Sequence, residues 1–224
     1  MQATIGVGLL PLLAFLGGAL TTTLVYLLGT REGGTSVTVM LLAGVAITAL
    51  SGAVIGLLTY LADDQMLRNL SLWQMGTLAA GKPADVALAL LTLAALLWLF
   101  MRDANPLNAL LLGEGEARHL GVNVQSLKRR LILLTAAGVG VAVAVSGMIG
   151  FVGLVVPHLV RLLAGPNHVR LLPLSALLGA ALLLAADMLA RTLLAPAELP
   201  VGIITALLGA PFFIWLLVKG RRAL

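Results

Sequence analysis

The feature that most constrains this sequence is a series of six long apolar runs separated by short polar stretches. A helix needs about 20 apolar residues to cross the roughly 30 Å hydrocarbon core of a bilayer, and each run approaches that length. The runs are continuous and rich in Leu and Ala, which favours helices over the alternating strands of a barrel. We therefore expect an all-α, polytopic transmembrane helix bundle. The runs are Ile5–Leu28, Val37–Leu61, Ala84–Met101, Leu131–Phe151, Leu171–Leu194 and Val201–Val218.

The charge content excludes a soluble domain. Only 10% of the 224 residues are charged and 60% are hydrophobic, whereas a soluble domain carries about 25% charged residues. The absence of cysteine excludes thiolate zinc and iron–sulfur sites within this chain. The net charge of +5 comes without a basic stripe interleaved with aromatic residues, so we expect no nucleic-acid partner.

The basic residues predict how the chain threads the membrane. A seventh, shorter apolar stretch, Val152–Leu163, contains Pro157 and indicates a short or broken helix. If this stretch also crosses, seven crossings result, with the first running inward and the C-terminus cytoplasmic. Eleven basic residues then lie on the cytoplasmic side and three outside, as the positive-inside rule requires. The three are Arg68, Lys82 and Arg191, and the eleven are Arg31, Arg102, Arg118, Lys128, Arg129, Arg130, Arg161, Arg170, Lys219, Arg221 and Arg222.

The one long polar stretch, residues 102–130, separates the third run from the fourth. Glu114 and Arg118 are spaced i,i+4 with the acid first, which predicts a short helix, and Gly121 is a candidate C-cap. Several leucines give this stretch an apolar contact surface. It can dock on a partner protein or lie on the lipid headgroups, and the residue pattern alone favours neither.

Other motifs give weaker indications. Residues 76–83 (GTLAAGKP) resemble a phosphate-binding loop but lack its final Ser or Thr and a preceding strand. Three histidines, His119, His158 and His168, show no metal-ligand spacing, so we expect structural roles. Ser51 and Ser146 lack a histidine partner at similar depth, which argues against an intramembrane protease.

Two features concern the membrane helices themselves. Asp187 and Arg191 are spaced i,i+4 in one run and either neutralise each other or present Arg191 to an acidic partner outside the membrane. Small residues at Gly52 and Gly56, and the series Gly147, Gly150 and Gly153, predict close helix approach.

Several motifs together resemble the FecCD family of ABC importer permeases, which includes the vitamin B12, ferric-siderophore and haem permeases. The similarity is concentrated in residues 147–161 (GMIGFVGLVVPHLVR) and continues in 186–191 (ADMLAR), 198–202 (ELPVG) and 209–212 (GAPF). A second signature covers residues 112–121. The matched motif positions are Gly147, Gly150, Gly153, Pro157, His158, Arg161, Asp187, Glu198, Pro200, Gly202 and Pro211.

The resemblance implies a single permease domain over residues 1–224, of the type II ABC importer kind, in the cell's inner membrane. It implies a homodimer, two cytoplasmic ABC ATPases that hold the ATP and Mg²⁺, and a periplasmic or extracellular substrate-binding protein; this chain itself carries no cofactor. Arg191 and Arg68 become candidate docking residues for the binding protein. Ser36, Val37 and Thr38 align with the cytoplasmic gate, although Val37 stands where a polar residue is expected. The ATPase-coupling residues implied are Gly113, Glu114, Ala117, Arg118, Leu120 and Gly121.

Length is the main departure from the family pattern. Members have about ten helices, and this chain carries about seven, so we expect helices to precede its first residue in the family's full arrangement. The outer stretch 58–76 is most similar to haem permeases, with ferric siderophore and then cobalamin as alternative substrates. An ATP-independent secondary transporter is a more distant alternative, for which Asp187 is the only candidate intramembrane carboxylate.

Overall fold

The computed structural model describes residues 2–31, 34–79 and 81–221, and these are mostly helical. The expected all-α fold is confirmed. The strands β1 and β2 form only a two-residue antiparallel ladder, pairing Thr30 with Thr35 and Arg31 with Gly34. In chain order the elements are α1 (Gln2–Gly29), β1 (Thr30–Arg31), β2 (Gly34–Thr35), α2 (Val37–Leu61), α3 (Asp64–Met75), α4 (Pro83–Arg102), α5 (Ala104–Leu110), α6 (Glu114–His119), α7 (Val124–Ser146), α8 (Val152–Ala164), α9 (His168–Thr192) and α10 (Val201–Arg221).

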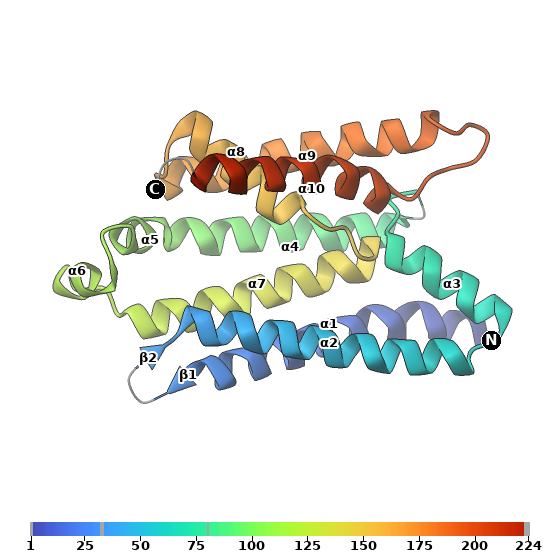
Figure 1. Cartoon of the computed structure of the whole chain (residues 1–224), viewed down its shortest axis with the longest axis horizontal. Helices are drawn as coiled ribbons and strands as arrows, with labels where there is room; N and C mark the ends of the chain where they lie inside the picture. The colour runs from blue at the N-terminus through green and yellow to red at the C-terminus, as the bar shows by residue number, and fades with distance from the viewer. Residues whose placement is uncertain (1, 32–33, 80, 222–224) are drawn as a thin grey trace.

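The long helices run side by side along one direction, with short elements at the two ends (Figure 1). Among the residues described, four helices are long and apolar enough to cross a membrane: Thr38–Leu61 of α2, and all of α4, α7 and α9. Shorter apolar helices cover Leu13–Gly29, Val152–Ala164 and Val201–Leu216. Each of the six predicted apolar runs therefore lies mainly in one long helix.

One predicted boundary is wrong. The run Leu131–Phe151 was expected to form a single span, but α7 begins at Val124 and ends at Ser146. Gly147 adopts a left-handed φ of 72°, and its N–H donates to the Val143 carbonyl at 2.8 Å, which closes the helix. Phe151 has a φ of 66°, rare for a bulky residue. Hydropathy continues unbroken across this bend, so the apolar pattern alone could not locate it.

Helix α8 follows the bend as a short helix, as predicted for the segment around Pro157. Its 13 residues span about 20 Å, less than the hydrocarbon thickness. The helix returns from the bend toward the end of the bundle that carries α5 and α6 (Figure 1). Together, residues 147–164 reverse the direction set by α7.

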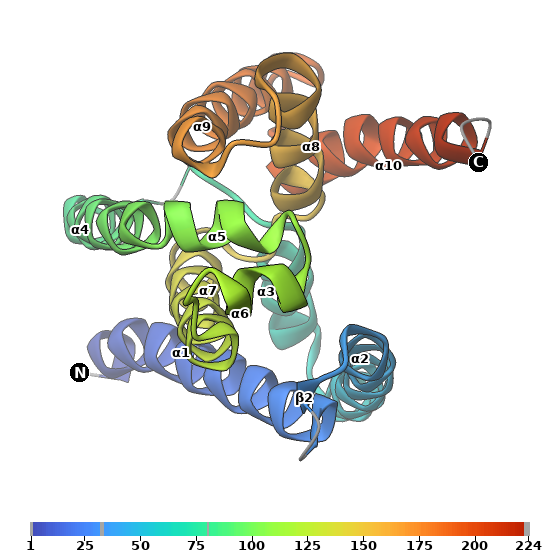
Figure 2. The ribbon, with the colours of Figure 1, turned by 90° about the vertical axis from the view of Figure 1, so that its left-hand side faces the viewer.

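Helix α7 lies near the centre of the end-on view (Figure 2). It packs against α1 and α4; α4 in turn contacts α9, which packs against both α8 and α10. Two small clusters of buried side chains hold the last three helices together. One joins Val156 and Val160 of α8 to Leu171 of α9, and the other joins Ala186 and Ala190 of α9 to Val201 and Ile204 of α10.

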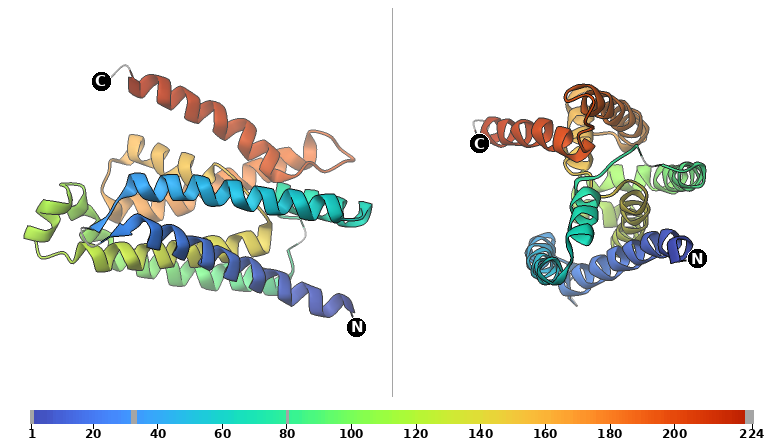
Figure 3. Two further views of the ribbon diagram at one scale, coloured as in Figure 1. Left: turned by 60° about the horizontal axis from the view of Figure 1, so that its bottom comes forward. Right: turned by 90° about the vertical axis from the view of Figure 1, so that its right-hand side faces the viewer.

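The two ends of the bundle differ in charge. We name the end that carries α5 and α6 the handle end; α3 and the α9–α10 connection lie at the opposite end (Figures 1 and 3). Ten of the eleven basic residues predicted for one side belong to elements or helix turns at the handle end, and Arg222 lies outside the described residues. Arg68, Lys82 and Arg191 belong to the opposite end. The predicted charge split thus matches the helix directions.

Helix α2 has an unusually open surface. Of its described side chains only Ala43 is buried, and Leu41, Leu42 and Leu58 are 67%, 65% and 59% exposed. A Cβ added at Gly52 or Gly56 would meet no described atom within 4 Å. The prediction of close packing at these two glycines is therefore wrong for this chain, because no described helix lies against that face. Such a surface suits lipid or another membrane subunit.

Candidate functional site

The candidate functional site is the segment between α4 and α7, residues 103–123, which side-chain contacts hold against neighbouring helices. We name this segment the handle. It contains the short helices α5 and α6 and projects from its end of the bundle (Figure 1). Figure 2 views it from outside, with α5 and α6 lying across the ends of the long helices. This is the core of the polar stretch 102–130 singled out in the sequence.

Local signals explain why α6 forms. Gly113 precedes it with a φ of 104°, and Glu114 and Glu116 occupy the first turn, where negative charge is favoured. Gly121, with a φ of 83°, follows the helix, and its N–H donates to the Arg118 carbonyl at 2.9 Å. The Val122 N–H donates to Ala117, also at 2.9 Å, which completes a Schellman motif. The predicted helix and the predicted glycine cap are both confirmed.

Ion pairs connect the handle to α7. The Glu114 carboxylate accepts a hydrogen bond from Lys128 Nζ, and its other oxygen lies 3.6 Å from the Arg118 guanidinium. Asp103, between α4 and α5, forms an ion pair with Arg130 of α7. The Asp103 side chain is only 5% exposed while that of Arg130 is 52% exposed, so the carboxylate depends strongly on this partner.

A third connection joins the handle to α9. The Asn108 side-chain oxygen accepts the backbone N–H of His168 at 2.7 Å and lies 3.0 Å from the His168 ring Nδ1. The Asn108 amide donates to Asn167 Oδ1, also at 3.0 Å. Asn167 in turn caps α9 by accepting the Val169 N–H. One asparagine of α5 therefore completes the N-terminus of α9, and His168 has the structural role expected of it.

The outer surface of the handle is apolar with a charged rim. Leu111, Leu112 and Leu120 are 51%, 66% and 64% exposed, and the side chain of Arg118 is 57% exposed. Ala117 faces inward and is fully buried. Exposed leucines beside an arginine that stays largely exposed in its ion pair with Glu114 form a surface suited to protein docking.

The structure brings all six predicted coupling residues together in and around α6. The predicted gate residues begin α2 at the same end: Ser36 is its N-cap and accepts the Val39 N–H, and Thr38 is exposed. The side chain of Val37 lies outside the described residues.

The predicted docking residues lie at the opposite end. Arg191 Nε donates to Asp187 Oδ2 at 2.8 Å, so the two residues do neutralise each other, yet the Arg191 side chain is still 45% exposed. Arg68 is exposed on α3. Figure 3 shows α3 crossing between α2 and the α8–α10 side of the bundle at this end.

The family-motif glycines have different roles. A Cβ at Gly147 would collide with the Trp73 carbonyl, so the predicted close packing is confirmed there. Gly202, for which no packing role was predicted, is as close to the Met75 carbonyl. A Cβ at Gly150 or Gly153 would meet no described atom within 4 Å. The predicted close approach is wrong there, because no described neighbour lies against these two positions.

The remaining motif residues belong to helix bodies and connections around these contacts. Pro157, with the neighbouring His158, and Pro211 lie inside α8 and α10, and Arg161 lies in the last turn of α8. Glu198 and Pro200 belong to the connection between α9 and α10, where the Leu199 N–H donates to Ala190 at 3.1 Å. These positions build the bundle, and no described cluster of three His, Asp or Glu side chains could hold a metal ion.

The stretch 76–83 serves as a connection. Gly76 is the C-cap of α3, Thr77 donates its N–H to Ser146 at 2.8 Å, and Pro83 begins α4. The element directly before it is the helix α3, whereas a phosphate-binding loop follows a strand.

Sequence reasoning missed the residues that hold the handle in place. Asp103 and Asn108 were assigned no role, and Lys128 and Arg130 were counted only as charges on one side. Their partners lie 27 residues away for Asp103 and 60 for the Asn108–His168 contact. The only available signal was a group of polar residues at an otherwise apolar helix end: Arg102, Asp103, Asn105 and Asn108.

Comparison with known proteins identifies the family. Residues 2–219 match the FecCD transport family. The chain is 51% identical to the hemin transport system permease protein HmuU of Yersinia pestis, over 93% of this chain and 62% of that protein. It is 46% identical to the vitamin B12 import system permease protein BtuC of Vibrio cholerae, over 91% of this chain and 61% of the relative.

A solved structure agrees. A metal-chelate type ABC transporter in an inward-facing conformation superposes with a TM-score of 0.76 at 37% identity, covering 82% of this chain and 60% of that one. The chain thus spans about three-fifths of the length of the relatives that it matches. Because the family match covers nearly the whole chain, this chain belongs to the FecCD transport family.

Proposed function

We propose that this chain is the membrane-spanning permease subunit of an ATP-binding-cassette importer, acting as a homodimer, and that its handle receives the motion of a cytoplasmic ATPase. The observation that carries the proposal is the handle itself: an apolar, charge-rimmed surface that directly follows α4 in the chain and is tied by side chains to α7 and α9. A surface fixed to three helices can transmit displacement to the pathway. A loop lying on headgroups would need no such links.

The handle end is the cytoplasmic end in this proposal, and the C-terminus lies on the same side. The gathering of basic residues there supports that orientation. Arg191 and Arg68 at the opposite end then face the substrate-binding protein. The partial exposure of Arg191 leaves its outer side available for an acidic residue of that partner.

Coupling requires that ATP binding and the conformation of the permease be thermodynamically linked. ATP binding can shift the permease between its two states only if the ATPase binds ATP differently in each. The contact that carries this difference is proposed to be α6, with Arg118 and Leu120 at its surface.

The first test separates hydrolysis from transport. The chain is reconstituted with its ATPase and binding protein, and uptake is measured per ATP hydrolysed for the wild type and for Arg118→Ala. We expect uptake per ATP to fall about tenfold or more, equivalent to losing about 1.4 kcal/mol of coupling. Arg170→Ala, which removes an exposed arginine of the same end outside the handle, is the matched control. Normal ATP-driven uptake by Arg118→Ala would contradict the coupling role.

The proposed cargo is haem, with a ferric siderophore or cobalamin as the alternatives. The higher identity to the hemin permease than to the B12 permeases supports this choice. ATPase stimulation by haem-loaded binding protein is compared with stimulation by siderophore- and cobalamin-loaded binding proteins. Stimulation by haem alone is the expected result, and stimulation by another cargo alone would overturn the substrate. Uptake that persists without ATP but follows the proton gradient would favour a secondary transporter.

A further inference from the structure

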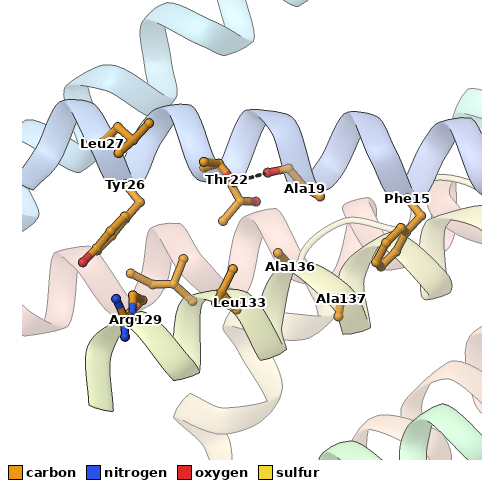
Figure 4. Close-up of a pocket in the computed structure, with 11 residues that line it drawn as sticks. Phe15, Ala19, Thr22, Tyr26, Leu27, Arg129, Leu133, Ala136 and Ala137 are labelled. Carbon is orange, nitrogen blue, oxygen red and sulfur yellow. Dashed lines mark hydrogen bonds between the residues drawn. The ribbon is translucent and has the colours of Figure 1, made fainter. Parts of the chain in front are cut away.

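A groove between α1 and α7 has no place in the proposed coupling mechanism. Its volume is about 320 Å³, and it is open along one side. One face of α1, with Phe15, Ala19 and Tyr26, forms one wall, and one face of α7, with Arg129, Leu133 and Ala136, forms the other. Figure 4 shows these side chains along the two helices.

The space in the groove results from small side chains next to a close contact between the two helices. The helices approach closely where Phe15 lies over Gly140: a Cβ there would lie 3.2 Å from the Phe15 Cα. Towards the handle end the small side chains of Ala19, Ala136 and Ala137 leave space between them. The Thr23 hydroxyl donates to the Ala19 carbonyl at 2.7 Å, so that polar group is already satisfied by backbone.

The mouth of the groove, by contrast, is cationic. Arg129 is the middle residue of the run Lys128–Arg129–Arg130, in which Lys128 pairs with Glu114 and Arg130 with Asp103. Arg129 is exposed and forms no ion pair within the described part of the chain. In Figure 4, Arg129 and Tyr26 extend from opposite walls toward each other across the mouth. An unpaired guanidinium beside a phenol is a good donor set for a phosphate group.

The depth of Arg129 along α7 and the length of the groove along α1 both match the dimensions of a membrane lipid. Arg129 lies 17 residues before Ser146, the last residue of α7, which is about 25 Å of helix and places the arginine near the edge of the hydrocarbon core. From Phe15 to Leu27 the groove wall covers about 18 Å of α1, against about 15 Å for the hydrocarbon of one leaflet. Tyr and Arg are residues that favour this interface.

We propose that this groove binds one anionic phospholipid, with an acyl chain along the Phe15–Ala136 wall and its phosphate on Arg129. The charge at the mouth favours an anionic lipid over a zwitterionic one. A zwitterionic headgroup carries its own cation, which compensates the phosphate, whereas an anionic headgroup leaves the phosphate charge to the Arg129 guanidinium. The site is independent of the proposed transport function. It assigns a role to the one residue of the basic run that the handle does not use.

The test measures lipid retention by the intact chain. The wild type is purified from bilayers holding equal amounts of phosphatidylglycerol and phosphatidylcholine, and bound lipids are counted by native mass spectrometry during detergent exchange. We expect one retained phosphatidylglycerol per chain. Arg129→Gln should lower the preference for phosphatidylglycerol about fivefold. Arg170→Gln, an exposed arginine of the same end outside the groove, should leave it unchanged.

A second variant tests the apolar wall. Ala136→Leu fills the groove while keeping Arg129, and is expected to reduce retention of both lipids. Should it fold poorly, Thr22→Leu on the opposite wall provides the same test. Equal retention of the two lipids by the wild type would overturn the proposal. So would an Arg129→Gln variant that keeps the wild-type preference, or an Arg170→Gln variant that loses it equally, since diffuse surface charge would then explain the binding.

Discussion

The two ends of the bundle are held together by different means. At the handle end, side chains reach between elements: Asp103 to Arg130, Glu114 to Lys128, and Asn108 to His168. At the opposite end, backbones meet directly. Gly147 lies against the Trp73 carbonyl and Gly202 against Met75, and the Thr77 N–H donates to the Ser146 carbonyl.

This difference separates a movable end from a fixed one. Exposed side-chain links, such as those of Glu114, can exchange partners with water or with a docking protein at small cost, so they can be broken and remade. The buried Asp103 carboxylate is the exception at this end. Backbone contact through glycine has no such alternative, because any added atom occupies space held by a carbonyl. The proposed ATPase contact falls at the end whose links can be remade.

The largest expected effect comes from the fixed end. Gly202→Val should lower the free energy of unfolding by about 3 to 4 kcal/mol, because the new side chain collides with the Met75 backbone. The measurement is denaturant unfolding in bilayer discs followed by tryptophan fluorescence. Gly115→Ala, at an open position of α6, is the control and should be neutral or slightly stabilising. Equal losses in both variants would remove the distinction between the ends.

The next effect comes from the buried carboxylate of the handle. Asp103→Ala should cost about 2 kcal/mol, less than for a fully buried pair because Arg130 is half-exposed and can reach water. Repeating the unfolding in 1 M salt sharpens the comparison. Screening should weaken the stabilisation that the wild type gains from this pair and leave the cost of Gly202→Val unchanged.

Asn108→Ala should cost about 1 to 2 kcal/mol, because it leaves the His168 N–H at the start of α9 without its acceptor. Asn108→Asp retains the acceptor oxygen and should recover most of that loss. Unfolding midpoints of the two variants, compared with wild type, give the result. If alanine and aspartate behave alike, the hydrogen bond to His168 does not fix the handle to α9.

The smallest expected change in stability is at Glu114, which is also a proposed ATPase-coupling residue. Glu114→Gln should change the free energy of unfolding by less than about 1 kcal/mol, since Glu114 and Arg118 are 44% and 57% exposed and the glutamine oxygen can still accept from Lys128. Under the proposed function it should nevertheless reduce uptake per ATP hydrolysed. Measuring both quantities on one preparation separates a docking role from a merely structural one. A variant that loses stability and coupling in proportion would support the structural role.

Sequence reasoning succeeded where the cause is local. The apolar runs located the long helices, Glu114 and Arg118 indicated α6, Gly121 indicated its cap, and the spacing of Asp187 and Arg191 gave their ion pair. Each of these depends on residues within one or two helical turns, which a periodic pattern can record.

The rest could not be predicted because it depends on which elements become neighbours. Gly147 and Gly153 look alike in the sequence, but only Gly147 has a backbone against it. The end of α7 depends on a left-handed residue inside an apolar run, and Phe151 adopts its φ of 66° with its side chain against Gly209. The contacts of Asp103 and Asn108 require α7 and α9 to be placed first.

The capped ends of α6 have a consequence for how that helix exchanges its amide protons with water. A six-residue helix alone would open so often that its amides would exchange nearly as fast as in an unfolded chain. Here the Schellman turn at Gly121 caps the end of α6, and the Glu114–Lys128 pair ties its beginning to the start of α7. The hydrogen-bonded amides from Ala117 to Val122 should therefore exchange slowly and together with the first turn of α7, as one cooperative unit, even though the helix lies at the surface of the chain.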